Sequence, residues 1–183
     1  MTAIQEINLM FDTETLGKKP GCGVLSIAVV PFQAGGLVSP LENFYVRILP
    51  QSNAAAGLHT DESTMAWWET KSIEAREEAF EGTVHLSAAL QYLSEYLSSF
   101  PPSTLIWGKG ASFDIPILEA AFDAFKQPYP WGYRQSMCFR TLEALYSQVP
   151  TPFANTLKHS ALGDAVFQAA HAQRILEWLL RHQ

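Results

Sequence analysis

The chain has 183 residues, 48% of them hydrophobic, and a formal net charge of −6 at pH 7. This length fits one domain with a substantial buried core, and the acidic balance argues against a broad basic face for a polyanion. Two bound divalent cations would cancel the charge of four carboxylates, so acidity alone does not exclude a nucleic acid as partner.

The sequence carries no sign of membrane insertion or export. No apolar run approaches the roughly 18 residues that a membrane span needs, and MTAIQEINLM at the N-terminus lacks the basic and apolar regions of a secretory signal. The two cysteines, Cys22 and Cys138, have no metal-type spacing and fit reduced thiols. We therefore expect one domain over residues 1–183, located in the cytoplasm and without a membrane partner.

Apolar patterns predict strands and short helices in the first half of the chain. Ile7–Phe11 and Val24–Phe32 are rich in large and β-branched side chains, which is typical of buried strands, and a segment with glycine and proline separates them. Asn43–Ile48 alternates between apolar and polar residues, which indicates a more exposed third strand. Two short helices are expected at Ser63–Thr70 and Ile73–Phe80.

The second half predicts alternating helices and strands. Leucines spaced by four, three and four residues predict an amphipathic helix over Leu86–Leu97. Leu105–Trp107 reads as a short buried strand, and Pro116 marks the first turn of the next helix. Apolar residues from 162 to 180 predict a last helix with Ser160 as its N-cap. This order of elements indicates an α/β fold in which helices flank a central mixed sheet.

The segment FDTETLG, residues 11–17, places two carboxylates where the first strand ends. If the strand continues through Glu14, Asp12 and Glu14 project from one face and Thr13 from the other. Two such carboxylates repel each other unless cations intervene, and their hard oxygen atoms suit Mg²⁺ or Mn²⁺. Taken alone, the pair is more simply a polar strand end.

Two later segments carry further candidate groups. Asp114 lies in LIWGKGASFDIPIL, just before the helix that Pro116 marks, where an aspartate commonly acts as an N-cap. His159 and Asp164 lie in LKHSALGDAVFQAA at the entrance of the last helix, whose N-terminus favours a carboxylate. Taken alone, a surface histidine with a first-turn aspartate explains this second segment as well.

Together and in this order, these segments resemble the three exonuclease motifs of the DEDDh family, the 3′→5′ exonucleases with a ribonuclease-H-like fold. The resemblance extends over nearly the whole chain. It is greatest to the branch described as 3′→5′ exoribonuclease-like or exodeoxyribonuclease-VIII-like, through FDTETLG, MAWWETKSIEAR, FRTLEAL and HSALGDAVFQA. One departure is CFRTL at Cys138–Leu142, because relatives often carry an aspartate before the Arg-Thr pair.

The resemblance implies a site and a reaction. The acids that would bind two divalent ions, Mg²⁺ or Mn²⁺, are Asp12, Glu14, Asp114 and Asp164, with His159 as general base. The implied reaction is hydrolysis of single-stranded nucleic-acid 3′ ends to nucleoside 5′-monophosphates, with RNA slightly favoured. DNA end-processing or proofreading is an alternative, as is an inactive nucleic-acid-binding module of the same fold. A homodimer is one assembly that the sequence leaves open.

Candidate substrate contacts lie beside these motifs. Leu16 is a candidate wedge beside the last base, with ordinary turn packing as its alternative, and Phe113 is a candidate stacking surface, with core packing as its alternative. Trp67 and Trp68 point about 100° apart on a helix, so we expect at most one to line the site. The full set of candidates is Thr15, Leu16, Gly17, Trp67, Phe113, Arg140 and Lys158.

Overall fold

The computed structural model describes residues 6–35, 43–153 and 159–182, and a five-stranded sheet lies at its centre. The strands are β1 (Asn8–Thr15), β2 (Val24–Phe32), β3 (Phe44–Arg47), β4 (Leu105–Gly108) and β5 (Ser136–Cys138). Their order is β3-β2-β1-β4-β5. β2 is antiparallel to β1 and β3, whereas β4 is parallel to β1 and β5. The predicted mixed sheet is confirmed, and the carboxyl ends of β1 and β4 meet at one edge.

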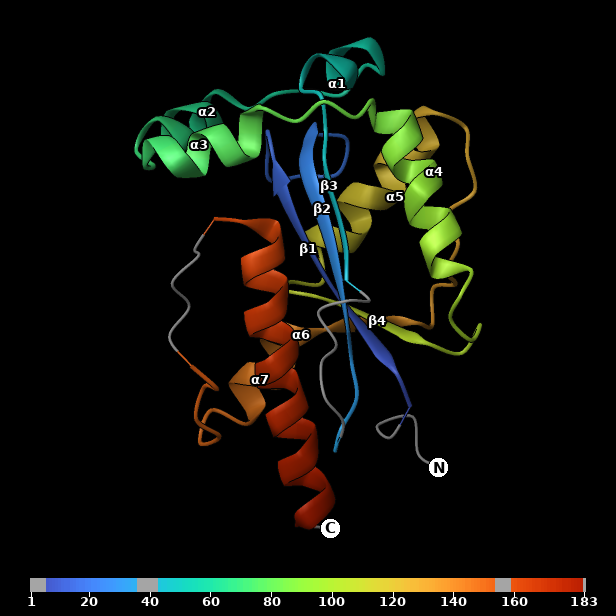
Figure 1. Cartoon of the computed structure of the whole chain (residues 1–183), viewed down its shortest axis with the longest axis vertical. Helices are drawn as coiled ribbons and strands as arrows, with labels where there is room; N and C mark the ends of the chain where they lie inside the picture. The colour runs from blue at the N-terminus through green and yellow to red at the C-terminus, as the bar shows by residue number, and fades with distance from the viewer. Residues whose placement is uncertain (1–5, 36–42, 154–158, 183) are drawn as a thin grey trace.

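Helices cover both faces of the sheet and one end of it. They are α1 (Gln51–Ala55), α2 (Glu62–Glu69), α3 (Ile73–Phe80), α4 (Leu86–Leu97), α5 (Asp114–Ala124), α6 (Phe139–Leu145) and α7 (Ala161–Arg181). Figure 1 shows α4 and α5 on one side, α6 and α7 on the other, and α1 to α3 beyond the end at which β1 finishes. Among these described helices, none combines the length and apolar character needed to cross a membrane.

Alternating side chains in the central strands build two hydrophobic cores. On one face, Leu9 and Phe11 of β1 pack with buried side chains of α4 and α5. On the other face, Met10 packs with Ala28 of β2 and with α7. Because the side-chain period of a strand is two, the residues that follow Met10 at every second position face α7 as well. The predicted buried face of α4 is confirmed at Leu86, Leu90, Leu93 and Leu97.

The last helix turns small side chains toward the sheet. Ala161, Ala165, Ala169 and Ala172 are fully buried, whereas Leu162, which the sequence pattern places on the apolar face, keeps partial exposure. Steps of three and four residues put these alanines on one stripe. Their short side chains let α7 approach β1 and β2 closely, since the distance between packed elements depends on the side chains at the contact.

Most predicted elements are confirmed, with differences at their ends. β1 extends through Glu14 to Thr15, as the same-face prediction for its two acids requires. Ser160 occupies the N-cap position of α7, but its side chain makes no capping hydrogen bond within the described residues. The sequence pattern does not predict α1, β5 or α6, because segments of five, three and seven residues are too short to show a clear period.

Candidate active site

Three carboxylates meet where β1 ends. Asp12 and Glu14 follow Met10 on the β1 face that α7 covers, and Asp164 lies in the first turn of α7. Each offers one carboxylate oxygen, and these three oxygens all lie within 4.8 Å of one another. Oxygen ligands converging at this spacing fit a hard divalent cation such as Mg²⁺ or Mn²⁺. We call Asp12, Glu14 and Asp164 the acid cluster.

The fourth predicted acid, Asp114, lies deeper and already has three donors. It is only 1% exposed. Its Oδ1 accepts hydrogen bonds from the backbone N–H of Thr13 at 3.1 Å and from the Thr13 hydroxyl at 2.9 Å. Its Oδ2 accepts from the backbone N–H of Lys109 at 2.9 Å. The helix N-cap is Phe113, so the N-cap interpretation of Asp114 is wrong. The carboxylate instead ties the loop after β4 to β1.

A glycine makes room for this buried carboxylate. Gly108 ends β4, and a Cβ atom there would lie 3.1 Å from Asp114 Oδ2 and 3.2 Å from Asp114 Cβ. Both distances are tighter than ordinary van der Waals contact, so a larger residue would require Asp114 to shift by a few tenths of an ångström. The absence of a side chain at this strand end therefore helps to set the position of the acid.

Burial and mutual repulsion make these acids hard to ionise without a cation. Burial is the main cause that raises the pKa of Asp12 well above its ordinary range, and the charges of Asp114, Glu14 and Asp164 add to it. Burial followed by the charge of Asp164 raises the pKa of Glu14 to about 8, and burial raises that of Asp114 to about 6. A bound divalent cation would remove this penalty.

We expect the metal-free protein to lose thermal stability as the pH rises from about 5 to 8. The pKa of Glu14 is about 8 in the folded chain, against 4.5 for an ordinary glutamate, so Glu14 keeps its proton through neutral pH. Its contribution to stability is complete below 4.5 and is lost as the pH rises through 8, because the unfolded chain then binds fewer protons than the folded one. Melting curves in EDTA across this range measure the effect.

The variant Glu14→Gln is the control for this pH dependence, because it keeps the shape of the side chain and cannot ionise. Its melting temperature should fall less with pH than that of the wild type. Excess Mn²⁺ should stabilise the wild type more at pH 8 than at pH 6. If the melting temperatures of the two proteins in EDTA fell equally with rising pH, the assigned role of Glu14 would be contradicted.

His159 lies beside the acid cluster and is held in an unusual backbone conformation. Its φ of 66° is in the left-handed region, which residues with a side chain rarely adopt. Its backbone N–H donates a hydrogen bond to Asp164 Oδ2 at 3.0 Å. Its ring meets the ring of Trp67 edge-on, with centroids 4.9 Å apart and planes at 88°. Strained conformations of this kind cluster at functional sites, and here one occurs at a histidine that lines the same hollow as the three carboxylates.

A hollow of about 450 Å³ opens over these groups. Its walls are Asp12, Thr13, Glu14, Thr15, Lys18, Thr64, Trp67, Trp68, Phe113, His159 and Asp164. Both tryptophans line the hollow, so the prediction that at most one would do so is wrong, although Trp67 is 37% exposed and Trp68 only 1%. Trp68 packs inward, and its Nε1–H donates to the backbone carbonyl of Thr15 at 3.0 Å. The hollow therefore combines carboxylates, an imidazole and aromatic walls.

Three of the seven predicted substrate-contact residues lie in the wall of the hollow, and four do not. Thr15, Trp67 and Phe113 line the hollow. Leu16 is 7% exposed and packs in a hydrophobic cluster with Leu25, Trp68 and Ala79, which agrees with the turn-packing alternative. Gly17 and the exposed Arg140 also lie outside the lining, and Lys158 lies outside the described residues. Substrate binding by all seven residues stays a prediction.

The sequence interpretation missed Gln168, which contacts the acid cluster directly. This residue of α7 donates a hydrogen bond from its side-chain amide to Asp12 Oδ1 at 2.6 Å. It follows Asp164 by four residues, so both lie on the same face of the helix. That spacing was the available signal, but an isolated glutamine in an apolar stretch has too many ordinary explanations to be singled out.

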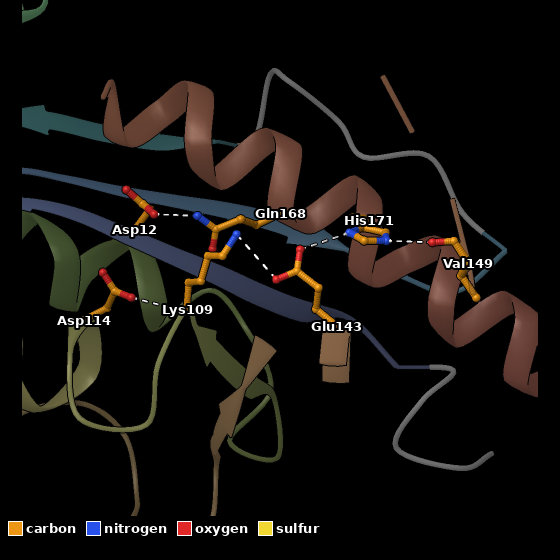
Figure 2. A network of polar contacts seen from close by, with 7 residues as sticks. All are labelled: Asp12, Lys109, Asp114, Glu143, Val149, Gln168 and His171. Atoms are coloured by element: carbon orange, nitrogen blue, oxygen red, sulfur yellow. Dashed lines mark hydrogen bonds and ion pairs between the residues drawn. The ribbon is translucent and has the colours of Figure 1, made fainter. Parts of the chain in front are cut away.

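A second set of contacts links α6, α7 and the loop after β4 (Figure 2). Lys109 Nζ lies 3.5 Å from a carboxylate oxygen of Glu143, and Glu143 lies 3.6 Å from Nδ1 of the buried His171. His171 Nε2 in turn lies 3.2 Å from the carbonyl of Val149, the acceptor in that pair. These contacts hold the side chain of Lys109, and the backbone N–H of Lys109 donates to Asp114.

Comparison with known families supports a nuclease fold. The family described as the 3′-5′ exoribonuclease Rv2179c-like domain matches residues 7–176 of this chain. No curated protein matches the chain.

Similar solved structures are nucleases. E. coli Exonuclease I in complex with a dA16 oligonucleotide is 17% identical with a TM-score of 0.69, and the match covers 97% of this chain and 44% of that one. The nuclease domain of 3′hExo, a DEDDh family member bound to rAMP, is 12% identical with a TM-score of 0.67, covering 94% and 92%. Cell-death related nuclease 4 (CRN-4) is 11% identical with a TM-score of 0.63, covering 96% and 65%. The chain thus spans less than half of Exonuclease I. The predicted ribonuclease-H-like α/β fold is confirmed.

Proposed function

Because the chain belongs to the Rv2179c-like 3′-5′ exoribonuclease domain family, we propose that it removes nucleotides from single-stranded 3′ ends, preferring RNA. It is a 3′-5′ exonuclease of the DEDDh kind, as the sequence motifs indicated. The observation that carries the proposal is the convergence of three carboxylate oxygens within 4.8 Å, in a hollow that His159 also lines. DNA end-processing or proofreading is the second candidate, favoured by the similarity to Exonuclease I with its bound dA16.

The acids would hold two divalent cations, Mg²⁺ or Mn²⁺. The acid cluster would bind one ion, and Asp12 with Asp114 the other, the latter through water because both Asp114 oxygens already accept hydrogen bonds. When bound, such ions stabilise the negative charge that develops on the attacking and leaving oxygens. The four predicted acids fit this task in chemistry, since all supply hard oxygen ligands.

His159 would act as the general base. A neutral imidazole can accept the proton of the attacking water, and this ring lies in the wall of the hollow beside Asp164. Cleavage of the last phosphodiester bond would leave the 3′ oxygen on the shortened strand. The released product would be a nucleoside 5′-monophosphate.

The walls of the hollow suit one unpaired nucleotide. Phe113 and Trp67 present aromatic surface, and stacking on such surface contributes about 1–3 kcal/mol per base without regard to sequence. Lys71 Nζ lies 4.2 Å from the centre of the Trp67 ring, and Lys18 lines the hollow, so positive charge that could attract a phosphate stands at its wall. These few contacts are enough to bind the end of a single strand. Binding a long duplex would need more positive charge than this acidic protein carries.

Labelled single strands test the proposal. The protein is incubated with 3′-labelled and 5′-labelled RNA and DNA of one sequence, with Mn²⁺, Mg²⁺ or EDTA. We expect early release of the 3′ label as a nucleoside 5′-monophosphate, faster from RNA, and none in EDTA. Initial release from the 5′ end, or activity that survives EDTA, would contradict the mechanism. Faster release from DNA would favour the second candidate, and binding without hydrolysis would favour the inactive-module alternative.

Three further expectations stay predictions: a cytoplasmic location, a homodimer, and one domain over the whole of residues 1–183.

A further inference from the structure

We propose that Gln168 is a positioning residue that holds Asp12 in the orientation needed for divalent-cation binding; this inference rests on the proposed function. The amide N–H of Gln168 reaches Asp12 Oδ1 at 2.6 Å, from a side chain that is 3% exposed. Figure 2 shows the Gln168 side chain extending from its helix toward Asp12. The donor comes from outside the acid cluster, from a side chain of α7.

The place of Gln168 on α7 explains how it reaches the strand. The alanine stripe brings the helix close to β1, and Gln168 interrupts that stripe between Ala165 and Ala169. A glutamine side chain can span the remaining gap, whereas an alanine cannot. Because Asp164 lies one turn earlier on the same face, one rigid helix carries both a predicted ligand and the donor that orients another.

The carbonyl oxygen of the Gln168 side chain argues against a purely structural role. Its Oε1 is buried and has no hydrogen-bond partner within the described residues. An unpaired buried acceptor costs free energy, so packing alone would favour an apolar residue of the same size at this position. The hydrogen bond to Asp12 is the contact that accounts for an amide here.

The Gln168 amide is uncharged, and this also favours a role in orienting Asp12. A lysine or arginine at this position would orient Asp12 as well, but its positive charge would compensate the acids and compete with a metal ion. Gln168 supplies a donor and leaves the negative charge of the acid cluster intact. Asp114 is held in the same way by neutral donors, the backbone N–H groups of Thr13 and Lys109 and the Thr13 hydroxyl. Outer contacts of this kind typically change metal affinity by about 10–100-fold when removed.

Titration with Mn²⁺ alone, without nucleic acid, tests this inference by calorimetry. Gln168→Leu keeps the approximate size of the side chain and removes the donor, and Gln168→Met serves if the first variant does not fold. We expect either to bind Mn²⁺ about 10–100-fold more weakly than the wild type. Their rate of hydrolysis should also need correspondingly more Mn²⁺ to reach half its maximum.

Gln173→Leu is the matched control. It makes the same substitution on the same helix, at a residue that donates to Glu177 and lies nine positions beyond Asp164. Its Mn²⁺ affinity should equal that of the wild type. Gln168 variants with unchanged Mn²⁺ affinity and a lowered melting temperature would overturn the inference and assign the residue a structural role. A wild type that binds no Mn²⁺ would instead overturn the proposed function.

Discussion

Asp12→Asn is expected to reduce kcat/KM for a 3′-labelled single strand by roughly 10³-fold or more, equivalent to several kcal/mol of transition-state stabilisation. Asp12 belongs to the acid cluster and is the acid that Gln168 orients. The substitution removes one negative charge and one ligand oxygen while keeping the shape of the side chain. Rates of nucleotide release at saturating Mn²⁺ measure the effect.

The stability of this variant separates lost chemistry from lost folding. Burial and three neighbouring carboxylates oppose the ionisation of Asp12, so its neutral replacement should unfold at a higher temperature than the wild type in EDTA at pH 8. Asp123→Asn, an equal change of charge on the exposed side of α5, should leave the rate unchanged. If Asp12→Asn kept a tenth of the wild-type rate, Asp12 would not be an essential metal ligand.

His159→Ala is expected to lower kcat by roughly 10²–10⁴-fold, the usual contribution of a general base. The ring lies in the wall of the hollow, while the contact from this residue to Asp164 is made by its backbone N–H. Removal of the ring should therefore leave Mn²⁺ affinity close to the wild-type value. Single-turnover rates and a Mn²⁺ titration measure the two properties separately.

The pH profile of the same variant gives a second criterion. Protonation of a general base lowers the rate on the acid side of the profile, so this limb should flatten when His159 is absent. His182→Ala, at the opposite end of α7 where the ring stacks on Trp178, is the matched control and should keep the full rate and profile. An acid limb that persists unchanged in His159→Ala would assign the base to another group.

The candidate site was predictable from sequence to different extents at different residues. Asp12 and Glu14 could be paired because a strand has a period of two, and that local geometry is what the structure shows. Asp114 was found as a motif residue, yet its nearest local interpretation, an N-cap, is wrong because the carboxylate bonds to Thr13, which lies 101 positions away in the chain. Local periodicity contains no information about such a partner.

The short and exposed elements were less predictable than the site. β5 has three residues and is mostly exposed, so neither length nor hydrophobicity marks it. Its strand character depends on pairing with β4, through Ile106 and Ser136 among others. Leu162 of α7 stays partly exposed while Leu176 is buried, because the part of the helix that approaches the sheet most closely packs through small alanine side chains.

The amino-acid sequence determined the kinds of chemistry available to this protein: the acids, the histidine, their order along the chain, and the faces of strand and helix on which they lie. Only the tertiary structure decided which of them meet. In the folded protein, Asp12, Glu14 and Asp164 lie together, Asp114 is hydrogen-bonded to Thr13, and Gln168 donates to Asp12. The physical reason is that residue periodicity defines a face, whereas the partner of that face depends on the order of strands and on how closely the alanines of α7 let the helix approach the sheet.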